Sequence, residues 1–414
     1  MAQAVERSME EDAREALMAL RVSLGHLLSI AAPRAERASE IQTSLKIDKK
    51  LAWRVHHFLN EPDVMAASLY LPSSAGLEQV LKGAREQAGD RASESEQSTR
   101  DAFESYMQVV SSHAGERNAM DMMMASTSPA AHAEASRNHQ RSAYKANSFI
   151  WGVQAKLQLS TMILKPSDEE PGRVDIAMLR GLAQLRRIRS NVPWVFARAL
   201  CVDDDGEVRH PFNLSSIDAQ PPRDDGLPPV NLLRDFCSKP VPEVRRVLGS
   251  DRHILDEIVE GPVGNTGLLD CFTGELASGI GVVYADDHNK VVDLAVRVRT
   301  PLQWLLVDVF THGEASPGDT PWLRTYSDIN GLDHAPGRAE RDRLPHNSEV
   351  QCLGKGLAGA FTPQLKKYPA MLEHAFGRLG WDASEFHHCR VLVEYPVMPS
   401  SVHIGWTLPE APAG

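Results

Sequence analysis

Residues 38–59 contain two short amphipathic segments joined by a tight turn, and this pattern constrains the fold more than any other stretch of the chain. In the first segment, Ile41 and Leu45 are four residues apart and therefore share one face of a helix. Asp48 is a suitable N-cap for a second helix, because its carboxylate can accept hydrogen bonds from the free amides of the first turn. The inner face of that second helix is expected to consist of Ala52, Val55 and Leu59. The pattern therefore predicts a pair of short helices that cross at close range.

The outer face of the predicted second helix is basic. Its polar side chains are Lys49, Lys50, Arg54 and His57, with Trp53 beside them. From Arg34 to His57 there are six Lys or Arg and three acidic residues, a net charge of +3, whereas the whole chain carries −11. The rest of the chain therefore totals −14. This distribution argues against a protein that coats nucleic acid over its whole surface, but it allows a small nucleic-acid-binding module on an acidic body.

The segment 38–59 resembles the helix-turn-helix of bacterial transcriptional regulators, with Glu10–Ile30 as a possible supporting first helix. The resemblance implies that the second helix enters the major groove of double-stranded DNA. It also implies a set of DNA-contacting residues, namely Thr43, Lys46, Lys49, Lys50, Trp53, Arg54 and His57. Gln42 and Lys46 stand where such motifs usually have Ala and Gly, so Lys46 is expected to need an unfavourable backbone conformation or a differently shaped turn. The alternative is a plain helical hairpin with a solvated basic face.

The five cysteines, at positions 201, 237, 271, 352 and 389, are widely spaced and include no C-x-x-C motif. This pattern favours free thiols in a reducing compartment over a disulfide framework or a zinc site. The chain has no apolar signal segment at its start and no apolar run long enough to span a membrane. We therefore expect a cytoplasmic protein without a membrane partner.

The pattern along the chain predicts an α+β fold in which a helical N-terminal part precedes a body of mainly antiparallel strand pairs. The expected domains are a helix-turn-helix domain at 1–90, a helical linker or dimerisation region at 91–160 and a sensor or interaction body at 161–414. The predicted helices are Glu10–Ile30, Gly76–Gln87, Asp101–Ser112, Pro129–Val153, Val241–Leu248 and Pro363–Leu379. The predicted strands are Trp194–Val202, Glu207–His210, Gly279–Tyr284, Val291–Val298, Trp304–Phe310, Cys389–Tyr395 and Val402–Leu408.

Three hairpins are expected in the body. They pair Trp194–Val202 with Glu207–His210, Gly279–Tyr284 with Val291–Val298, and Cys389–Tyr395 with Val402–Leu408. In addition, His253, Asp256 and Glu257 are spaced to share one face of a helix, where a salt-bridged surface is favoured over an acid–base pair.

No P-loop, dinucleotide-binding, nucleophile-elbow or zinc-protease motif occurs in the chain. His387, His388 and Cys389 could offer metal ligands, but neighbouring residues on a strand point to opposite faces, so a structural role is favoured. The sequence thus assigns no catalytic residue, no metal site and no cofactor. An enzyme without a readable motif remains an alternative, as does a protein-interaction scaffold.

The leading interpretation is a DNA-binding transcriptional regulator with a C-terminal sensor or dimerisation body. A homodimer is expected, because one short helix-turn-helix covers only half of a binding site. A small-molecule effector is possible, and Trp194 and Trp304 could form a wall of its pocket if they do not simply fill the core.

Overall fold

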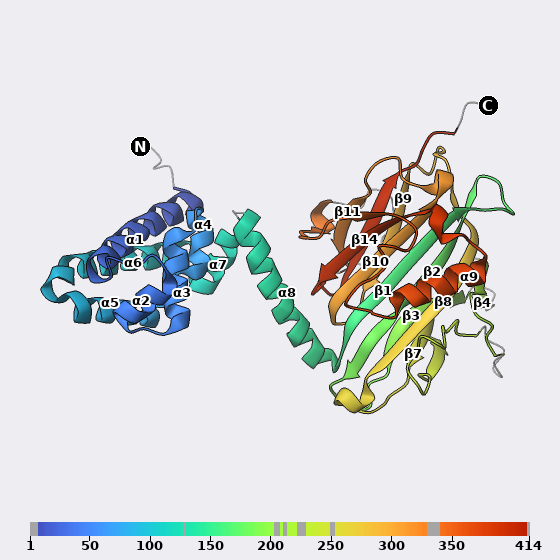
Figure 1. Cartoon of the computed structure of the whole chain (residues 1–414), viewed down its shortest axis with the longest axis horizontal. Coiled ribbons are helices and arrows are strands. Elements are labelled where there is room, and N and C mark those ends of the chain that lie inside the picture. The colour runs from blue at the N-terminus through green and yellow to red at the C-terminus, as the bar shows by residue number, and fades with distance from the viewer. Residues whose placement is uncertain are drawn as a thin grey trace, which may run out of the picture. The chain divides into compact units, whose positions relative to one another are not determined.

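The computed structural model describes residues 7–126, 129–202, 208–209, 213–221, 229–248, 253–328 and 340–411. The chain divides into two compact units, Met1–His139 and Gln140–Gly414 (Figure 1). The first unit is helical and the second is rich in strands, so the predicted α+β class is confirmed. None of the described helices is both long and apolar enough to cross a membrane.

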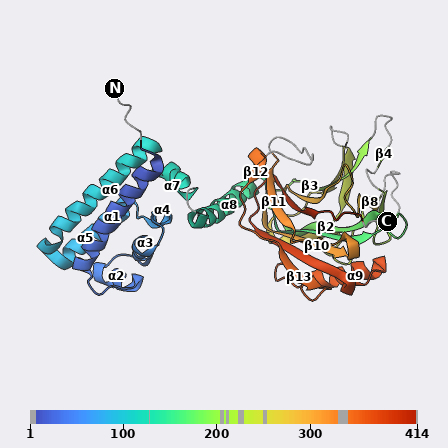
Figure 2. The same cartoon turned by 90° about the horizontal axis from the view of Figure 1, so that it is seen from above.

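The helical unit is a bundle around one apolar core. Its elements are α1 Met9–Ala31, α2 Ala38–Leu45, α3 Lys49–Asn60, α4 Val64–Ala67, η1 Ser68–Tyr70, α5 Ser74–Ala88, η2 Gly89–Ala92, α6 Ser93–His113, α7 Arg117–Ala125 and the start of α8 Pro129–Trp151. A capping box begins α1, where the Ser8 hydroxyl accepts from the Glu11 amide and the Glu11 carboxylate accepts from the Ser8 amide. The Leu-rich face of α1 lies along α6 (Figure 2).

Helices α6 and α7 belong to the same core as α1. Phe103, Tyr106 and Val110 of α6 and Met120 and Met124 of α7 are buried in it. The helical unit therefore continues past residue 90 as one packing unit, up to His139.

The described part of the second unit contains the end of α8, three sheets and the helix α9 Tyr368–Leu379. The strands are β1 Val153–Pro166, β2 Arg173–Arg187, β3 Trp194–Val202, β4 Val208–Arg209, β5 Asn213–Ser216, β6 Val244–Leu248, β7 His253–Ile258, β8 Leu269–Val282, β9 Val291–Val298, β10 Leu302–His312, β11 Trp322–Ser327, β12 Arg343–Leu344, β13 Gln351–Lys355, β14 Phe386–Glu394 and β15 Ser400–Thr407. The largest sheet has the order β13-β14-β10-β1-β2-β8-β5, and only β1 and β10 are parallel in it. The two four-stranded sheets have the orders β12-β11-β15-β9 and β4-β3-β7-β6.

Each face of the large sheet buries a separate apolar cluster. On one face, α9 contributes Tyr368, Met371 and Phe376 to a cluster with residues of the central strands (Figure 1). On the other face, the large sheet packs against residues of the smaller sheets, such as Val402 and Ile404 of β15. The sheet is therefore covered on both sides, which explains its long apolar runs.

Several predicted elements were wrong because partner choice in a sheet is not local. The central strands β1 and β2 were missed, and β1 begins within the region expected to be helical. Of the three predicted hairpins only β3–β4 forms. Strand β9 pairs with β15 rather than β8, and β14 pairs with β10 and β13 rather than β15. At these two places, consecutive strands thus enter different sheets.

The helix predicted at Val241–Leu248 is also wrong, and so is the helical face proposed for residues 253–257. The chain forms antiparallel strands β6 and β7 there. Arg246 of β6 lies opposite Asp256 of β7, and its Nε donates to the buried Asp256 carboxylate at 2.7 Å. Asp256 was expected on a helical face with His253 and Glu257. On β7 its carboxylate instead forms an ion pair with Arg246 of the neighbouring strand.

Candidate nucleic-acid interface

The two short helices predicted in residues 38–59 are present as α2 and α3, joined by a three-residue turn. Lys46 ends α2 in the left-handed conformation, with φ 56° and ψ 37°. The expected strain at this position is confirmed, because a side chain makes the left-handed region unfavourable and Gly would adopt it more easily. Asp48 is the N-cap of α3, and its carboxylate accepts from the amides of Lys50 and Leu51 at 2.9 and 3.0 Å.

The inner face of α3 differs slightly from the prediction. Ala52 and Val55 are fully buried, but Phe58 rather than Leu59 completes the buried stripe, and Leu59 is half-buried. Leu51 adds to this face from the first turn. The helix is therefore anchored along three turns, which leaves its opposite side to solvent.

Helix α5 holds α2 in place through a close approach at Gly83. A Cβ atom at this position would lie 2.4 Å from the carbonyl oxygen of Leu45 and 3.0 Å from its Cβ. Only Gly allows the two backbones to come so near at the end of α2. This contact positions the turn that leads into α3.

The lysines expected to contact DNA lie on the surface. Lys46, Lys49 and Lys50 are exposed, as is Thr43, whose hydroxyl donates to the Ser39 carbonyl at 2.9 Å. The lysines surround the beginning of α3, the end of a recognition helix that contacts base edges in helix-turn-helix proteins. We refer to the exposed residues Thr43, Lys46, Lys49, Lys50 and Trp53, together with the half-buried His57, as the α3 surface.

Aromatic rings continue the α3 surface toward the end of the helix. Trp53 is 42% exposed and lies against His57, with the ring centroids 4.0 Å apart. Tyr70, from η1, packs on both rings at 5.5 and 5.3 Å. Sequence reasoning missed Tyr70, because it joins this group only through the fold of residues 61–70.

Arg54 is the one predicted contact residue that the structure places elsewhere. It is half-buried, and its guanidinium donates to the carbonyl oxygens of Leu69, Tyr70 and Leu71. Burial lowers the pKa of Arg54 below its ordinary value, the nearby charge of Arg117 lowers it further, and Asp121 opposes the shift. Arg54 therefore fastens α3 to η1, because its donors are engaged by these backbone carbonyls.

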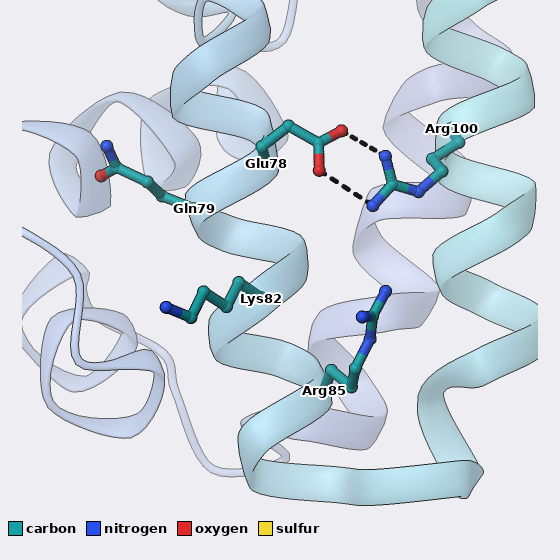
Figure 3. Close-up of a pocket in the computed structure, with 5 residues that line it drawn as sticks. All are labelled: Glu78, Gln79, Lys82, Arg85 and Arg100. Carbon is teal, nitrogen blue, oxygen red and sulfur yellow. Dashed lines mark hydrogen bonds and ion pairs between the residues drawn. The ribbon is translucent and has the colours of Figure 1, made fainter.

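A shallow hollow of about 400 Å³ lies between α5 and α6 in the same unit (Figure 3). Its lining residues are Glu78, Gln79, Lys82, Arg85 and Arg100. Arg100 forms a two-pronged ion pair with Glu78, and the buried Glu96 accepts from Arg85 and Arg100. The hydrogen bond from Arg85 lowers the pKa of Glu96, while its burial opposes the shift. The arginines here are thus compensated by carboxylates.

The strand-rich unit contains a buried polar network that includes His388. Asp308 of β10 accepts from Tyr368, His388 and Arg390 at 2.7–2.8 Å. Despite the burial of Asp308, the hydrogen bonds from Arg390 and His388 keep the pKa of its carboxyl below the ordinary value. The His388 ring also stacks on Phe310, with the ring centroids 4.1 Å apart. Among the described residues, no group of three or more His, Cys, Asp or Glu side chains could hold a metal ion.

Trp194 and Trp304 do not share a pocket wall. Trp194 packs against the cluster between the sheets and donates its indole N–H to Thr300 at 2.9 Å. Trp304 packs against the cluster under α9, on the other face of the large sheet. The two rings therefore pack in different parts of the core, the alternative to a pocket wall given by the sequence analysis, and they do not line one pocket together.

Comparisons of the chain with protein-family models, with curated proteins and with solved structures found no match.

Proposed function

We propose that this protein binds double-stranded DNA through helix α3 and acts as a transcriptional regulator. The observation that carries the proposal is the grouping of Lys46, Lys49 and Lys50 around the exposed start of the capped helix α3, which follows α2 after a three-residue turn. Lysines in this position can contact phosphates, and Trp53 and His57 extend the surface with rings that can pack on the sugar–phosphate backbone or base edges. Two of the acidic side chains nearby already accept hydrogen bonds from backbone amides. Glu40 accepts from the amides of Glu36 and Arg37, and Asp48 accepts from those of Lys50 and Leu51.

The proposal includes a homodimer in the cytoplasm, with the strand-rich unit as the sensing or dimerising part. One α3 helix spans about half a site, and two copies about 34 Å apart would read a palindrome. A dimer mass by light scattering in the presence of duplex DNA supports this part, and a monomer bound at saturation opposes it. A small-molecule effector would have to change DNA affinity by its differential binding to two states.

The test is the salt dependence of DNA binding. The fluorescence anisotropy of a labelled duplex should give a steep decrease in affinity with salt, with a slope of about −0.9 per phosphate contact. Replacing Lys49 and Lys50 together by Ala should flatten the slope by about two units and weaken binding to all sequences.

A matched control removes the same charge from the other unit. Lys355 and Lys366 are exposed there, so their double replacement by Ala should leave the slope unchanged. If the two double variants behave alike, or if wild-type protein shows no salt-dependent binding, α3 is not a DNA-reading helix.

A second candidate function, a protein-interaction scaffold, is favoured by exposed apolar residues at one end of the large sheet. The most exposed are Phe149 at 76% and Ile150 at 62%, both at the end of α8. Ile188 follows β2, and Arg189 donates to the Ile150 carbonyl at 3.0 Å, so these segments lie together. Capture of a partner that is lost with Phe149→Ser/Ile150→Ser but kept with Met18→Ser/Val22→Ser, an exposed apolar pair on α1, would support this function.

A further inference from the structure

Two cysteines face each other across the edge of the large sheet. Cys352 on β13 and Cys389 on β14 are directly opposite residues of the antiparallel ladder, and their sulfur atoms lie 3.3 Å apart. Opposite residues in such a ladder have Cα atoms about 4.5–5.5 Å apart, which lies within the range that disulfides span. The two thiols thus need only a small approach to reach the bonding distance of about 2.05 Å.

The surrounding backbone can accommodate that approach. Strand β13 is a five-residue edge strand, and its pairing register shifts between Cys352 and Gly354. Such an irregularity bends the strand locally, so a movement of about 1 Å at Cys352 does not propagate through a regular ladder. Cys389 lies on the interior strand β14 and stays fixed by its pairing with β10.

Access to solvent differs between the two thiols. Cys352 is exposed, whereas Cys389 is buried, and burial together with the neighbouring Cys352 raises the pKa of Cys389 to about 12. A dissolved oxidant therefore meets Cys352 first, and Cys389 remains a protonated thiol beside it. This is the arrangement of an exposed thiol next to a resolving thiol.

We propose that Cys352 and Cys389 form a peroxide-responsive dithiol that closes to a disulfide and clamps β13 to β14. In the first step the Cys352 thiolate attacks hydrogen peroxide, the O–O bond breaks, and Cys352 becomes a sulfenic acid as hydroxide leaves and is protonated to water. In the second step the Cys389 sulfur attacks the Cys352 sulfur and expels the hydroxyl group, which departs as water with the Cys389 proton. The balance is one peroxide reduced to two waters and two thiols oxidised to one disulfide.

The bond would enclose the segment that covers the buried polar network. Between the two cysteines lie α9, with Tyr368, and the carbonyls of Ala360 and Phe361, which accept from Arg390 at 2.9 and 3.0 Å. Closing this loop lowers the entropy of the unfolded chain. The oxidised protein should therefore melt at a temperature higher by on the order of 5–10 °C.

A second thiol pair in the same unit provides an internal comparison. Cys237 and Cys271 are hydrogen-bonded to each other, and that hydrogen bond lowers the pKa of Cys237 to about 7 despite its burial. Both side chains are buried, at 6% and 0% exposure, so dissolved peroxide cannot reach them readily. The proposal thus predicts that exposure, rather than thiol acidity, decides which pair is oxidised.

The experiment treats the reduced full-length protein with a few equivalents of hydrogen peroxide, blocks remaining thiols with an alkylating agent and maps peptides without reduction. We expect a peptide that joins Cys352 to Cys389, and the same product in Cys237→Ser. Cys389→Ser should instead accumulate a sulfenic acid at Cys352 that a dimedone-type reagent traps, while Cys352→Ser should give neither product.

Circular dichroism of each variant before oxidation establishes that it is folded, and the trapped sulfenic acid tests the order of steps without requiring a disulfide. Alkylation of both Cys352 and Cys389 after peroxide treatment would overturn the proposal. A disulfide between Cys237 and Cys271 in their place would also overturn it, as would a sulfenic acid found at Cys389 in Cys352→Ser.

Discussion

The guanidinium groups of Arg54 and Arg117 donate to the same acceptor, the carbonyl oxygen of Leu71, at 2.7 and 2.6 Å. Arg117 also donates to the Pro72 carbonyl, and Asp121 lies 3.8 Å from Arg117 and partly offsets the two positive charges. The chain after η1 is therefore held by side chains from α3 and α7, which fixes the back of the candidate DNA-binding helix.

This arrangement predicts that Arg54→Ala affects stability rather than direct DNA contact. Loss of the charged hydrogen bonds should lower the free energy of unfolding by about 2 kcal/mol, measured by urea denaturation. Arg34→Ala, at an exposed arginine just before α2, should change it by less than about 0.5 kcal/mol. The salt slope of DNA binding should stay at the wild-type value in Arg54→Ala under conditions where it is folded. A slope as flat as that of the Lys49/Lys50 variant would show that Arg54 contacts phosphate after all.

The backbone of Lys46 predicts opposite effects on stability and on DNA affinity. Since its left-handed conformation disfavours a side chain, Lys46→Gly should raise the free energy of unfolding by about 1 kcal/mol. Lys82→Gly, at an exposed position within α5, should lower it by about 1 kcal/mol. Because Lys46→Gly also removes a positive charge from the α3 surface, DNA affinity should fall and the salt slope should flatten by about one unit. A destabilised Lys46→Gly protein would mean that the lysine side chain makes a compensating contact.

These examples show what the sequence could and could not predict. Ile41, Leu45 and Asp48 act within a few residues of themselves, so spacing and capping rules were enough to predict α2, the turn and α3. The position of Arg54 depends on Leu71 and Arg117, which are 17 and 63 residues away, and no local pattern encodes that contact. The sheet shows the same division, because β3 and β9 match the predicted residues while the pairing of β9 with β15 depends on layers that form only in the complete unit.

The buried carboxylate of Asp308 predicts a specific dependence of stability on pH. Asp308→Asn should lower the free energy of unfolding at pH 7 by about 3–5 kcal/mol, because Arg390 would lose its buried counter-charge. The folded-state pKa of Asp308 lies below its ordinary value. The carboxylate therefore contributes to the free energy of unfolding above the unfolded pKa of about 3.9, and this contribution is lost as the pH falls through the folded pKa.

Urea denaturation between pH 7 and pH 3 should thus show that the free energy of unfolding decreases more steeply with falling pH for wild type than for Asp308→Asn. Asp168→Asn, whose side chain is 82% exposed, should follow the wild-type curve. Equal acid losses in wild type and Asp308→Asn would contradict the ionised network.

The crossing of α5 and α2 predicts that two Gly→Ala substitutions in helices of the same unit will have opposite signs. At Gly83 the added methyl group would meet the backbone oxygen of Leu45 at 2.4 Å, and a backbone atom cannot move aside as a side chain can. We expect Gly83→Ala to lower the free energy of unfolding by about 1–3 kcal/mol, since overpacking forces the two helices apart. At Gly25, in α1, the nearest atom would be a side-chain carbon of Leu59 at 3.9 Å, an ordinary contact. Gly25→Ala should therefore raise the free energy of unfolding by about 0.5–1 kcal/mol, as Ala does in a helix interior.

Because Gly83 supports the end of α2, Gly83→Ala should also weaken DNA binding when the protein is folded, whereas Gly25→Ala should leave it unchanged. Urea denaturation and DNA anisotropy on the same samples measure both effects, and a Gly83→Ala protein as stable as wild type would show that α2 can shift without cost.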